Sequence, residues 1–165
     1  MIYEPEEDSF LLAKYVSKYA RGKVLDMGCG SCIQSEAALA KTKNVLAVDI
    51  NKEAVKLAEK KGIKAIQSDL FEKVTGKYNL IIFNPPYLPE EKGEDLESKQ
   101  ITTGGKKGSE ILERFLKDTK SHLALEGDIL LVVSSLTPNV EKLFKDNGYE
   151  YKILETKSIF FEKLI

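Results

Sequence analysis

Residues 78–87, Tyr-Asn-Leu-Ile-Ile-Phe-Asn-Pro-Pro-Tyr, constrain the fold of this chain more than any other stretch. The unbroken apolar run at 80–83 is typical of a strand that is buried on both faces of a parallel sheet. Pro85 and Pro86 have no backbone N–H and a fixed φ, so neither can continue a central strand. The sequence therefore predicts that Asn84 lies at the carboxyl end of a buried strand, where open α/β sheets place their ligands.

The residues at this strand end can hold a planar NH2 group. The side-chain oxygen of Asn84 and the carbonyl of Pro85 can accept two hydrogen bonds from one such group, and Tyr87 can lay its ring over the plane. A strand that merely ends in an Asn-Pro turn is the alternative. We interpret the stretch as an active site for an amide or an exocyclic amine. Asn-Pro-Pro-Tyr resembles the signature of class I S-adenosylmethionine-dependent methyltransferases that act on planar nitrogens.

Composition sets broad limits on what the chain can be. With 165 residues, 42% of them hydrophobic, we expect a single domain that spans residues 1–165. The net charge of −1 supplies no basic field for nucleic acid or an acidic membrane. Two cysteines without an export signal favour a reducing, cytoplasmic setting, and the longest apolar runs are too short to cross a bilayer.

A glycine turn follows the first predicted strand. Residues 23–32 read as a strand, a tight turn with Gly28 and Gly30, and the start of a helix at 35–41. Asp26 precedes the first glycine by two positions, and no lysine follows as it would in a phosphate-binding P-loop. An acidic residue beside exposed backbone suits a cationic ligand, such as the ammonium group of a methionine moiety.

Two further carboxylates follow predicted strands. Asp49 ends the strand at 44–49, where this kind of fold binds ribose hydroxyls, although it could simply cap the next helix at 52–61. Asp69 follows the short strand at 64–67 and could accept a hydrogen bond from an adenine amino group. Three carboxylates at successive strand ends are a pattern that folding alone does not require.

The remaining elements complete a doubly wound sheet. The stripe from Leu11 to Tyr19 predicts a helix capped by Asp8 or Ser9, and Thr137-Pro138 predicts another helix that ends at Asn147-Gly148. Residues 127–133 read as a fifth strand, and 150–155 with 158–164 read as an antiparallel hairpin. We therefore expect an α/β class with a seven-stranded, mostly parallel sheet and a C-terminal antiparallel hairpin.

Cys29 and Cys32 form a Cys-x-x-Cys pair, which can indicate thioredoxin-like redox chemistry. Both positions lie in the glycine turn, where small residues are needed in any case. A metal site would need more ligands, and the sole histidine, His122, is distant in sequence. We predict neither redox chemistry nor a metal site.

Four stretches together resemble one family: 3–9 (Tyr-Glu-Pro-Glu-Glu-Asp-Ser), 25–30, 83–87, and 104–108 with the helix that follows. The chain resembles the HemK-related glutamine N5-methyltransferases, in particular the short archaeal and eukaryotic branch that modifies class 1 translation release factors. This resemblance implies a class I, Rossmann-like methyltransferase fold and transfer of a methyl group to the glutamine of the release factor's Gly-Gly-Gln loop.

The resemblance also assigns residues and partners. Contacts to S-adenosyl-L-methionine would come from Ser9, Asp26, Gly28, Gly30, Asp49, Asp69, Leu70 and Asn84, and the substrate glutamine would be held by Asn84, Pro85 and Tyr87. Members of this branch work with a small zinc-binding activator subunit. We expect that subunit to extend the sheet at the strand 64–67, which would lie at one edge. The family usually has a third glycine where this chain has Cys32.

Two rival functions use the same motif. Enzymes that methylate adenine N6 or guanine N2 in nucleic acids also carry Asn-Pro-Pro-Tyr, but residues 88–100 hold five acidic residues and two lysines, which would repel phosphates. A methyltransferase fold retained as a non-catalytic binding subunit is the second rival, and the intact Asn84 and strand-end carboxylates argue against it.

Overall fold

The computed structural model describes residues 2, 4–86, 109–159 and 162–165. The chain divides into two compact units. The first unit contains Met1–Asn84 and Thr119–Leu131, and the second contains Pro85–Asp118 and Val132–Ile165.

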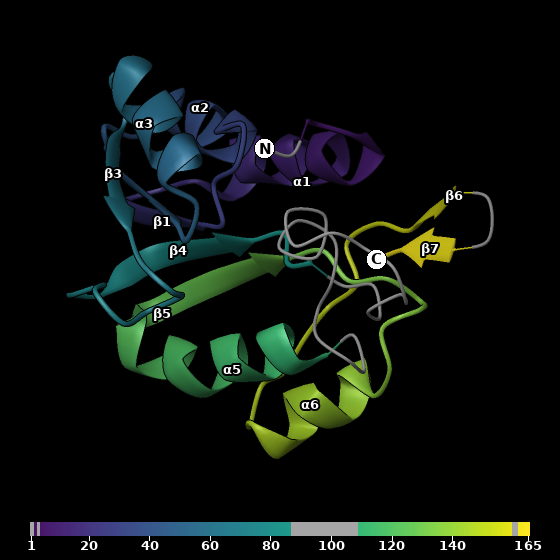
Figure 1. Ribbon diagram of the computed structural model, residues 1–165. Helices are drawn as coiled ribbons and strands as arrows, with labels where there is room; N and C mark the ends of the chain where they lie inside the picture. The colour runs from purple at the N-terminus through teal and green to yellow at the C-terminus, as the bar shows by residue number, and fades with distance from the viewer. Residues whose placement is uncertain (1, 3, 87–108, 160–161) are drawn as a thin grey trace. The chain divides into compact units, whose positions relative to one another are not determined.

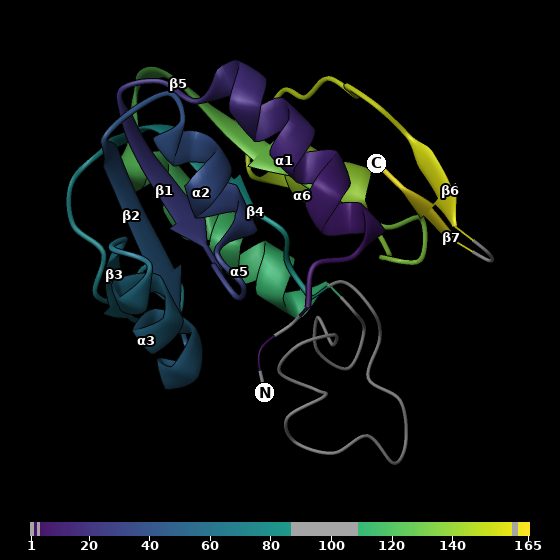
Figure 2. The ribbon, with the colours of Figure 1, turned by 90° about the horizontal axis from the view of Figure 1, so that it is seen from above.

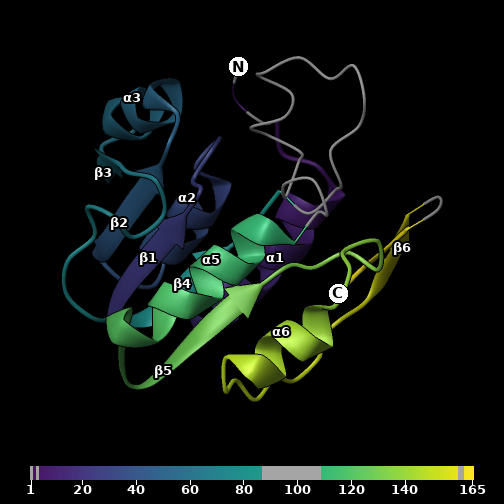
Figure 3. The ribbon, with the colours of Figure 1, turned by 60° about the horizontal axis from the view of Figure 1, so that its bottom comes forward.

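The first unit is built on a five-stranded parallel sheet with the order β3-β2-β1-β4-β5 (Figure 3). Its strands are β1 (Lys23–Met27), β2 (Asn44–Asp49), β3 (Lys64–Gln67), β4 (Tyr78–Phe83) and β5 (Leu123–Leu131). The central strands are almost wholly buried, as their apolar runs predicted. The alignment of Met27 with both Val48 and Phe83 brings the carboxyl ends of β1, β2 and β4 together.

Three helices of the first unit, α1 (Glu7–Tyr19), α2 (Ile33–Leu39) and α3 (Lys52–Lys60), lie on one face of this sheet (Figures 1 and 2). Leu12 and Val16 of α1 are buried, as the helical spacing predicted. A short 3-10 helix, η1 (Lys120–His122), precedes β5. Gly62 follows α3 with a φ of +75°, the left-handed conformation that commonly ends a helix.

The second unit contains most of α5 (Glu110–Thr119) together with α6 (Val140–Asp146), β6 (Lys157–Ile159) and β7 (Glu162–Leu164). Asn147 is the C-cap of α6, and Gly148 follows with a φ of +70°, so the helix stops at the predicted Asn-Gly pair. Val133 and Ile165 exchange both backbone hydrogen bonds, which ties the C-terminal residue into this unit.

The prediction of one seven-stranded sheet is wrong. Among the described residues the parallel sheet has five strands, and β6 and β7 form a separate antiparallel pair. The predicted hairpin partner 150–155 forms no strand. Tyr151 instead packs its ring against Phe144 of α6, with 5.0 Å between ring centroids, so side-chain packing replaces ladder hydrogen bonds in this stretch.

Three predicted boundaries are also wrong. The second helix begins at Ile33 rather than 35, because Cys32 already occupies its N-cap position. The helix predicted at Thr137-Pro138 begins at Val140, because the Thr137 N–H bonds to the Ser134 carbonyl in a turn. The fifth strand spans Leu123–Leu131 rather than 127–133, since pairing with β4 starts at Leu123 and resumes after a register shift.

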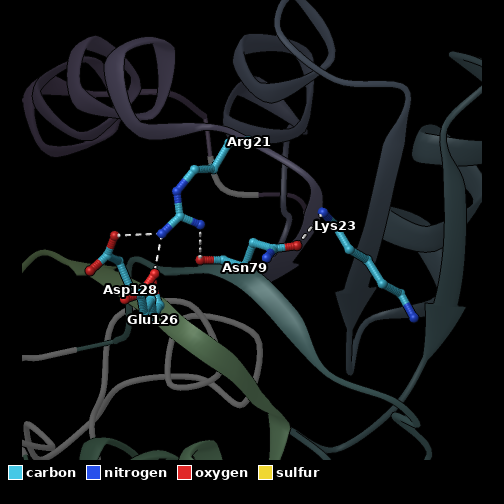
Figure 4. A network of polar contacts seen from close by, with 5 residues as sticks. All are labelled: Arg21, Lys23, Asn79, Glu126 and Asp128. Carbon is cyan, nitrogen blue, oxygen red and sulfur yellow. Dashed lines mark hydrogen bonds and ion pairs between the residues drawn. The ribbon is translucent and has the colours of Figure 1, made fainter.

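A polar network joins the amino ends of β1, β4 and β5 (Figure 4). The Arg21 guanidinium donates to the carbonyls of Asn79 and Glu126, at 3.1 and 2.6 Å, and pairs with Asp128. The Asn79 side-chain oxygen accepts from the Lys23 N–H at 2.9 Å. These contacts fix the three strands at the end of the sheet opposite Asn84. None of the helices in the described part of the chain combines the length and apolar character needed to cross a membrane.

Candidate active site

The carboxyl end of β1 passes directly into the glycine turn. The N–H groups of Gly28 and Cys29 both donate to the Val48 carbonyl, at 2.7 and 3.0 Å, which holds the turn against the end of β2. Gly28 and Gly30 have φ values of +67° and +46°, in the left-handed region that favours glycine. The two glycines therefore have the conformational role that the sequence predicted.

Asp49 at the end of β2 holds the same turn from its other side. One carboxylate oxygen accepts from the Gly30 N–H at 2.9 Å, and the other accepts from the Asn51 N–H at 2.8 Å. Burial raises the pKa of the Asp49 carboxyl, and these backbone N–H groups oppose the shift. The N-cap of α3 is Asn51, whose side chain accepts from the Glu53 N–H. Capping α3 is thus not the task of Asp49.

Asp26 lies within β1 and is almost fully buried. Its carboxylate accepts a hydrogen bond from the Ser35 hydroxyl of α2 at 2.6 Å. Burial raises the pKa of Asp26 to about 7, against the lowering effect of its bonds to Ser35. Near neutral pH this side chain is therefore divided between its charged and neutral forms.

Asn84 follows β4, as predicted, and its amide is held in one orientation. Its Nδ2 donates to Asp8 Oδ2 at 2.9 Å, so a carboxylate fixes which end of the amide is nitrogen. Its Oδ1 is buried and has no hydrogen-bond partner among the described residues. Because Asn84 Oδ1 has a fixed orientation and no partner, it suits an incoming N–H donor.

Asp8 and Ser9 do not cap α1, contrary to prediction. The helix begins at Glu7, and both residues lie buried in its first turn. Asp8 Oδ1 accepts from the Ser9 N–H at 2.7 Å while Oδ2 accepts from Asn84. Asp8 belongs to the N-terminal motif at 3–9, but the local spacing of that motif cannot reveal its contact with Asn84.

Gln34 was not singled out from the sequence. It lies on α2 with only 6% of its surface exposed, and its Nε2 donates to the Ser9 carbonyl at 2.9 Å. Its Oε1 is the other buried side-chain atom without a partner in the described residues. Its signal in the sequence, a polar residue directly after a glycine turn, is too common to be used alone.

The turn after β3 carries the third predicted carboxylate. The Ser68 N–H donates to the Asp49 carbonyl at 2.9 Å, which places this turn beside the end of β2. Asp69 is half-buried. Leu70 adopts a φ of +48°, and the Ser68 hydroxyl donates to its carbonyl at 2.9 Å. The structure therefore brings Asp26, Asp49 and Asp69 together at the carboxyl ends of the neighbouring parallel strands β1, β2 and β3.

One of the predicted substrate residues, Pro85, is not part of this unit. Pro85 begins the second unit, where it is buried. Tyr87 and the acidic stretch 88–100 lie outside the described residues.

Comparison with known proteins places this chain in a family. A family model described as the methyltransferase small domain matches residues 4–160. The chain belongs to this methyltransferase family. A Methanocaldococcus jannaschii protein, assigned by name to the protein N5-glutamine methyltransferases, is 39% identical over 99% of this chain and 89% of its own.

More distant members of the methyltransferase family differ in their named substrates. A release factor glutamine methyltransferase from Borreliella burgdorferi is 31% identical over 84% of this chain and 52% of its own. A ribosomal RNA small subunit methyltransferase C from Haemophilus influenzae is 28% identical over 87% of this chain and 42% of its own.

Among solved structures, the E. cuniculi Mtq2-Trm112 complex, described as responsible for methylation of the eRF1 translation termination factor, contains a similar chain. It has a TM-score of 0.78 and 24% identity, and the match covers 99% of this chain and 94% of that one. At this identity the likeness shows the shared methyltransferase fold.

Cys32 stands where the family resemblance implied a third glycine, and its backbone explains why glycine is common there. Cys32 has a φ of +71°, so the turn keeps its left-handed conformation at a strain of roughly 1–2 kcal/mol. Its side chain is fully buried in a small apolar cluster with Cys29, Ala47 and Ala58. Both cysteines are free thiols, and hydrogen bonding to Cys32 together with burial raises the pKa of Cys29. Packing accounts for both side chains.

Proposed function

We propose that this chain is an S-adenosylmethionine-dependent methyltransferase whose acceptor is the side-chain amide nitrogen of the glutamine in the Gly-Gly-Gln loop of a class 1 release factor. The observation that carries the proposal is the Asn84 amide, which is locked by Asp8 and presents a buried, unpartnered oxygen at a strand end. The named activities of the relatives from M. jannaschii and B. burgdorferi support the choice of substrate.

The first unit fits the cofactor well. Asp49 lies at the end of β2, where it would accept from the ribose hydroxyls, and its bonds to the Gly30 and Asn51 N–H groups hold the carboxylate in place. Asp69 and Leu70 would line the adenine end, and the turn at Gly28 and Gly30 allows close approach of backbone to ligand. The contacts predicted for Ser9 and Asp26 belong to the same proposal. S-Adenosylmethionine, when bound, supplies an electrophilic sulfonium methyl group.

The protein's task is to present a poor nucleophile. An amide lone pair is delocalised into the carbonyl, so a primary amide nitrogen must be oriented accurately to react. Asn84 Oδ1 and the Pro85 carbonyl would accept its two N–H bonds, and the Tyr87 ring would cover its plane. This is catalysis by positioning and oriented dipoles. A nitrogen that has gained a methyl group is strongly acidic and loses its proton to water, so no general base is required.

We further propose that residues 1–165 act as one catalytic domain that pairs with a small zinc-binding activator protein. Among the described residues β3 is an outer strand of the five-stranded sheet, and it is only four residues long. Its half-buried Ala65 and Ile66 suit the addition of a partner strand. Release factors work in the cytosol, in agreement with the reducing setting expected from the composition.

Transfer of a radiolabelled methyl group tests the proposed function. We expect label on a recombinant release factor, none on a variant whose Gly-Gly-Gln glutamine is replaced by alanine, and none on naked DNA or RNA. Label that persists on the alanine variant would contradict the assigned acceptor. Label on nucleic acid alone would instead favour the rival function of a nucleic-acid methyltransferase, and the H. influenzae relative is named as a ribosomal RNA methyltransferase.

A further inference from the structure

The two buried orphan oxygens of the described residues belong to amides that are anchored by consecutive residues. Asn84 Nδ2 donates to the Asp8 carboxylate, and Gln34 Nε2 donates to the Ser9 carbonyl, both at 2.9 Å. In each amide the remaining oxygen is buried and has no partner. Asn84 has a role in the proposed function, whereas Gln34 has none so far.

The orientation of the Gln34 amide is set by chemistry. The Ser9 carbonyl can only accept a hydrogen bond, so the atom that faces it must be the NH2 nitrogen. Flipping the amide would bring two acceptors together. Oε1 is thus a fixed acceptor, and leaving such a buried acceptor without a partner destabilises the protein. A buried polar atom of this kind indicates a missing partner such as a ligand.

The position of Gln34 indicates which part of the ligand supplies the missing hydrogen-bond donor. Gln34 lies two residues after Cys32, the N-cap of α2, and next to Ser35, whose hydroxyl bonds to Asp26. It is therefore between the glycine turn and the residues that hold Asn84. The methionine moiety shares its sulfur with the methyl group to be transferred, so it must lie at the Asn84 end of the cofactor.

Only a few groups of S-adenosylmethionine can donate a hydrogen bond to Gln34 Oε1. In the proposed function Asp49 and Asp69 would accept from the ribose hydroxyls and the adenine amino group, which leaves the α-ammonium of the methionine moiety as the donor without an assigned neutral acceptor. Asp26 is the carboxylate expected near this cation, but it is already bound to Ser35 and its pKa is raised to about 7, so it leaves room for a second acceptor. The amide oxygen of Gln34 is a neutral acceptor whose capacity to accept does not change with pH in this range, so it suits the ammonium group alongside Asp26.

We propose that Gln34 Oε1 accepts a hydrogen bond from the α-ammonium group of S-adenosylmethionine. The inference rests on the proposed function, since it requires that this cofactor binds at the glycine turn. It makes Gln34 a cofactor-binding residue of this chain. Each of the two buried oxygens without a partner would then accept a hydrogen bond from a bound N–H group, Asn84 Oδ1 from the substrate amide and Gln34 Oε1 from the cofactor.

Calorimetry with two ligands tests this contact. S-Adenosylhomocysteine carries the ammonium group, whereas 5′-methylthioadenosine lacks the whole amino-acid moiety and serves as the internal control. Hydrogen bonds to charged groups are worth about 1.5–3 kcal/mol, so Gln34→Leu should weaken S-adenosylhomocysteine binding roughly 10-fold or more. Binding of 5′-methylthioadenosine should change less than about twofold.

Other outcomes separate the alternatives. Equal weakening of both ligands would show that Gln34 only holds α1 through Ser9, and an unchanged affinity for both would show that Oε1 meets water alone; either overturns the inference. Gln34→Glu keeps an acceptor but loses the bond to Ser9, and should preserve the ratio of the two affinities; a reduced ratio would contradict the proposal. A wild-type protein that binds neither ligand would refute the proposed cofactor itself.

Discussion

Asn84 Nδ2 donates a hydrogen bond to Asp8 Oδ2 at 2.9 Å, joining residues that are 76 positions apart in the chain. The contact links the N-terminal acidic motif to the end of β4, and it leaves Asn84 Oδ1 as a buried acceptor. Asp8 is therefore a positioning residue, which acts through Asn84.

Asp8→Ala tests this link. Loss of the carboxylate frees the Asn84 amide to rotate, so we expect kcat to fall about 10- to 100-fold, from a hydrogen bond worth about 1–3 kcal/mol. Affinity for S-adenosylhomocysteine should change only a few-fold. Glu7→Ala removes the adjacent, exposed acid of the same helical turn and should leave kcat unchanged. A kcat of Asp8→Ala within twofold of wild type would show that Asn84 holds its orientation without Asp8.

The buried Asp26 makes stability depend on pH. Its pKa is raised from 3.8 to about 7, so the folded protein binds the proton more tightly than the unfolded chain does. The free energy of unfolding should therefore fall as pH rises from about 4 to about 7, and this contribution should be constant above that range. Asp26→Asn keeps an acceptor for Ser35 but does not titrate. In urea denaturation its stability relative to wild type should rise across this window; a flat difference would rule out the buried titration.

Gly22 and Gly62 form a matched pair for a test of the network around Asn79. Both have left-handed backbones, with φ of +58° and +75°. A Cβ at Gly22 would lie 2.3 Å from Asn79 Oδ1, whereas one at Gly62 has nothing within 4 Å. We expect Gly62→Ala to cost about 1–2 kcal/mol of stability from backbone strain. Gly22→Ala should cost about 1–3 kcal/mol more, because it also disrupts the bond between Asn79 and Lys23. Equal losses for the two variants would mean that Asn79 moves aside freely.

The sequence predicted the parts of the fold that depend on local patterns. Apolar runs located the five parallel strands, and the prolines after Phe83 placed Asn84 at a strand end. The failures concern contacts that the local pattern of residue types does not specify. Residues 150–155 have strand-like composition, but a strand requires a partner, and Tyr151 packs on Phe144 instead. Asp8 looked like a cap because its partner, Asn84, is brought to it only by the folded sheet.

The exposed edge of β3 provides a test of the proposed partner. Ile66→Pro removes a backbone N–H from this strand, and Ile66→Lys places a charge on it. Both should abolish co-purification with the activator protein if the partner extends the sheet here. Leu125→Lys is the control, because Leu125 is 94% exposed on β5, the outer strand on the other side of the sheet. A complex that survives both Ile66 changes would place the docking surface elsewhere.

The single-turnover rate of Asn84→Ala, at saturating S-adenosylmethionine and release factor, tests the central claim most directly. If Asn84 Oδ1 holds the reacting amide, its loss removes an interaction of the transition state and should slow methyl transfer roughly 100- to 1000-fold. Cofactor affinity, measured in parallel, should remain within several-fold of wild type. A variant that retains more than about a tenth of the wild-type rate would contradict the assignment of Asn84 as the residue that presents the nucleophile.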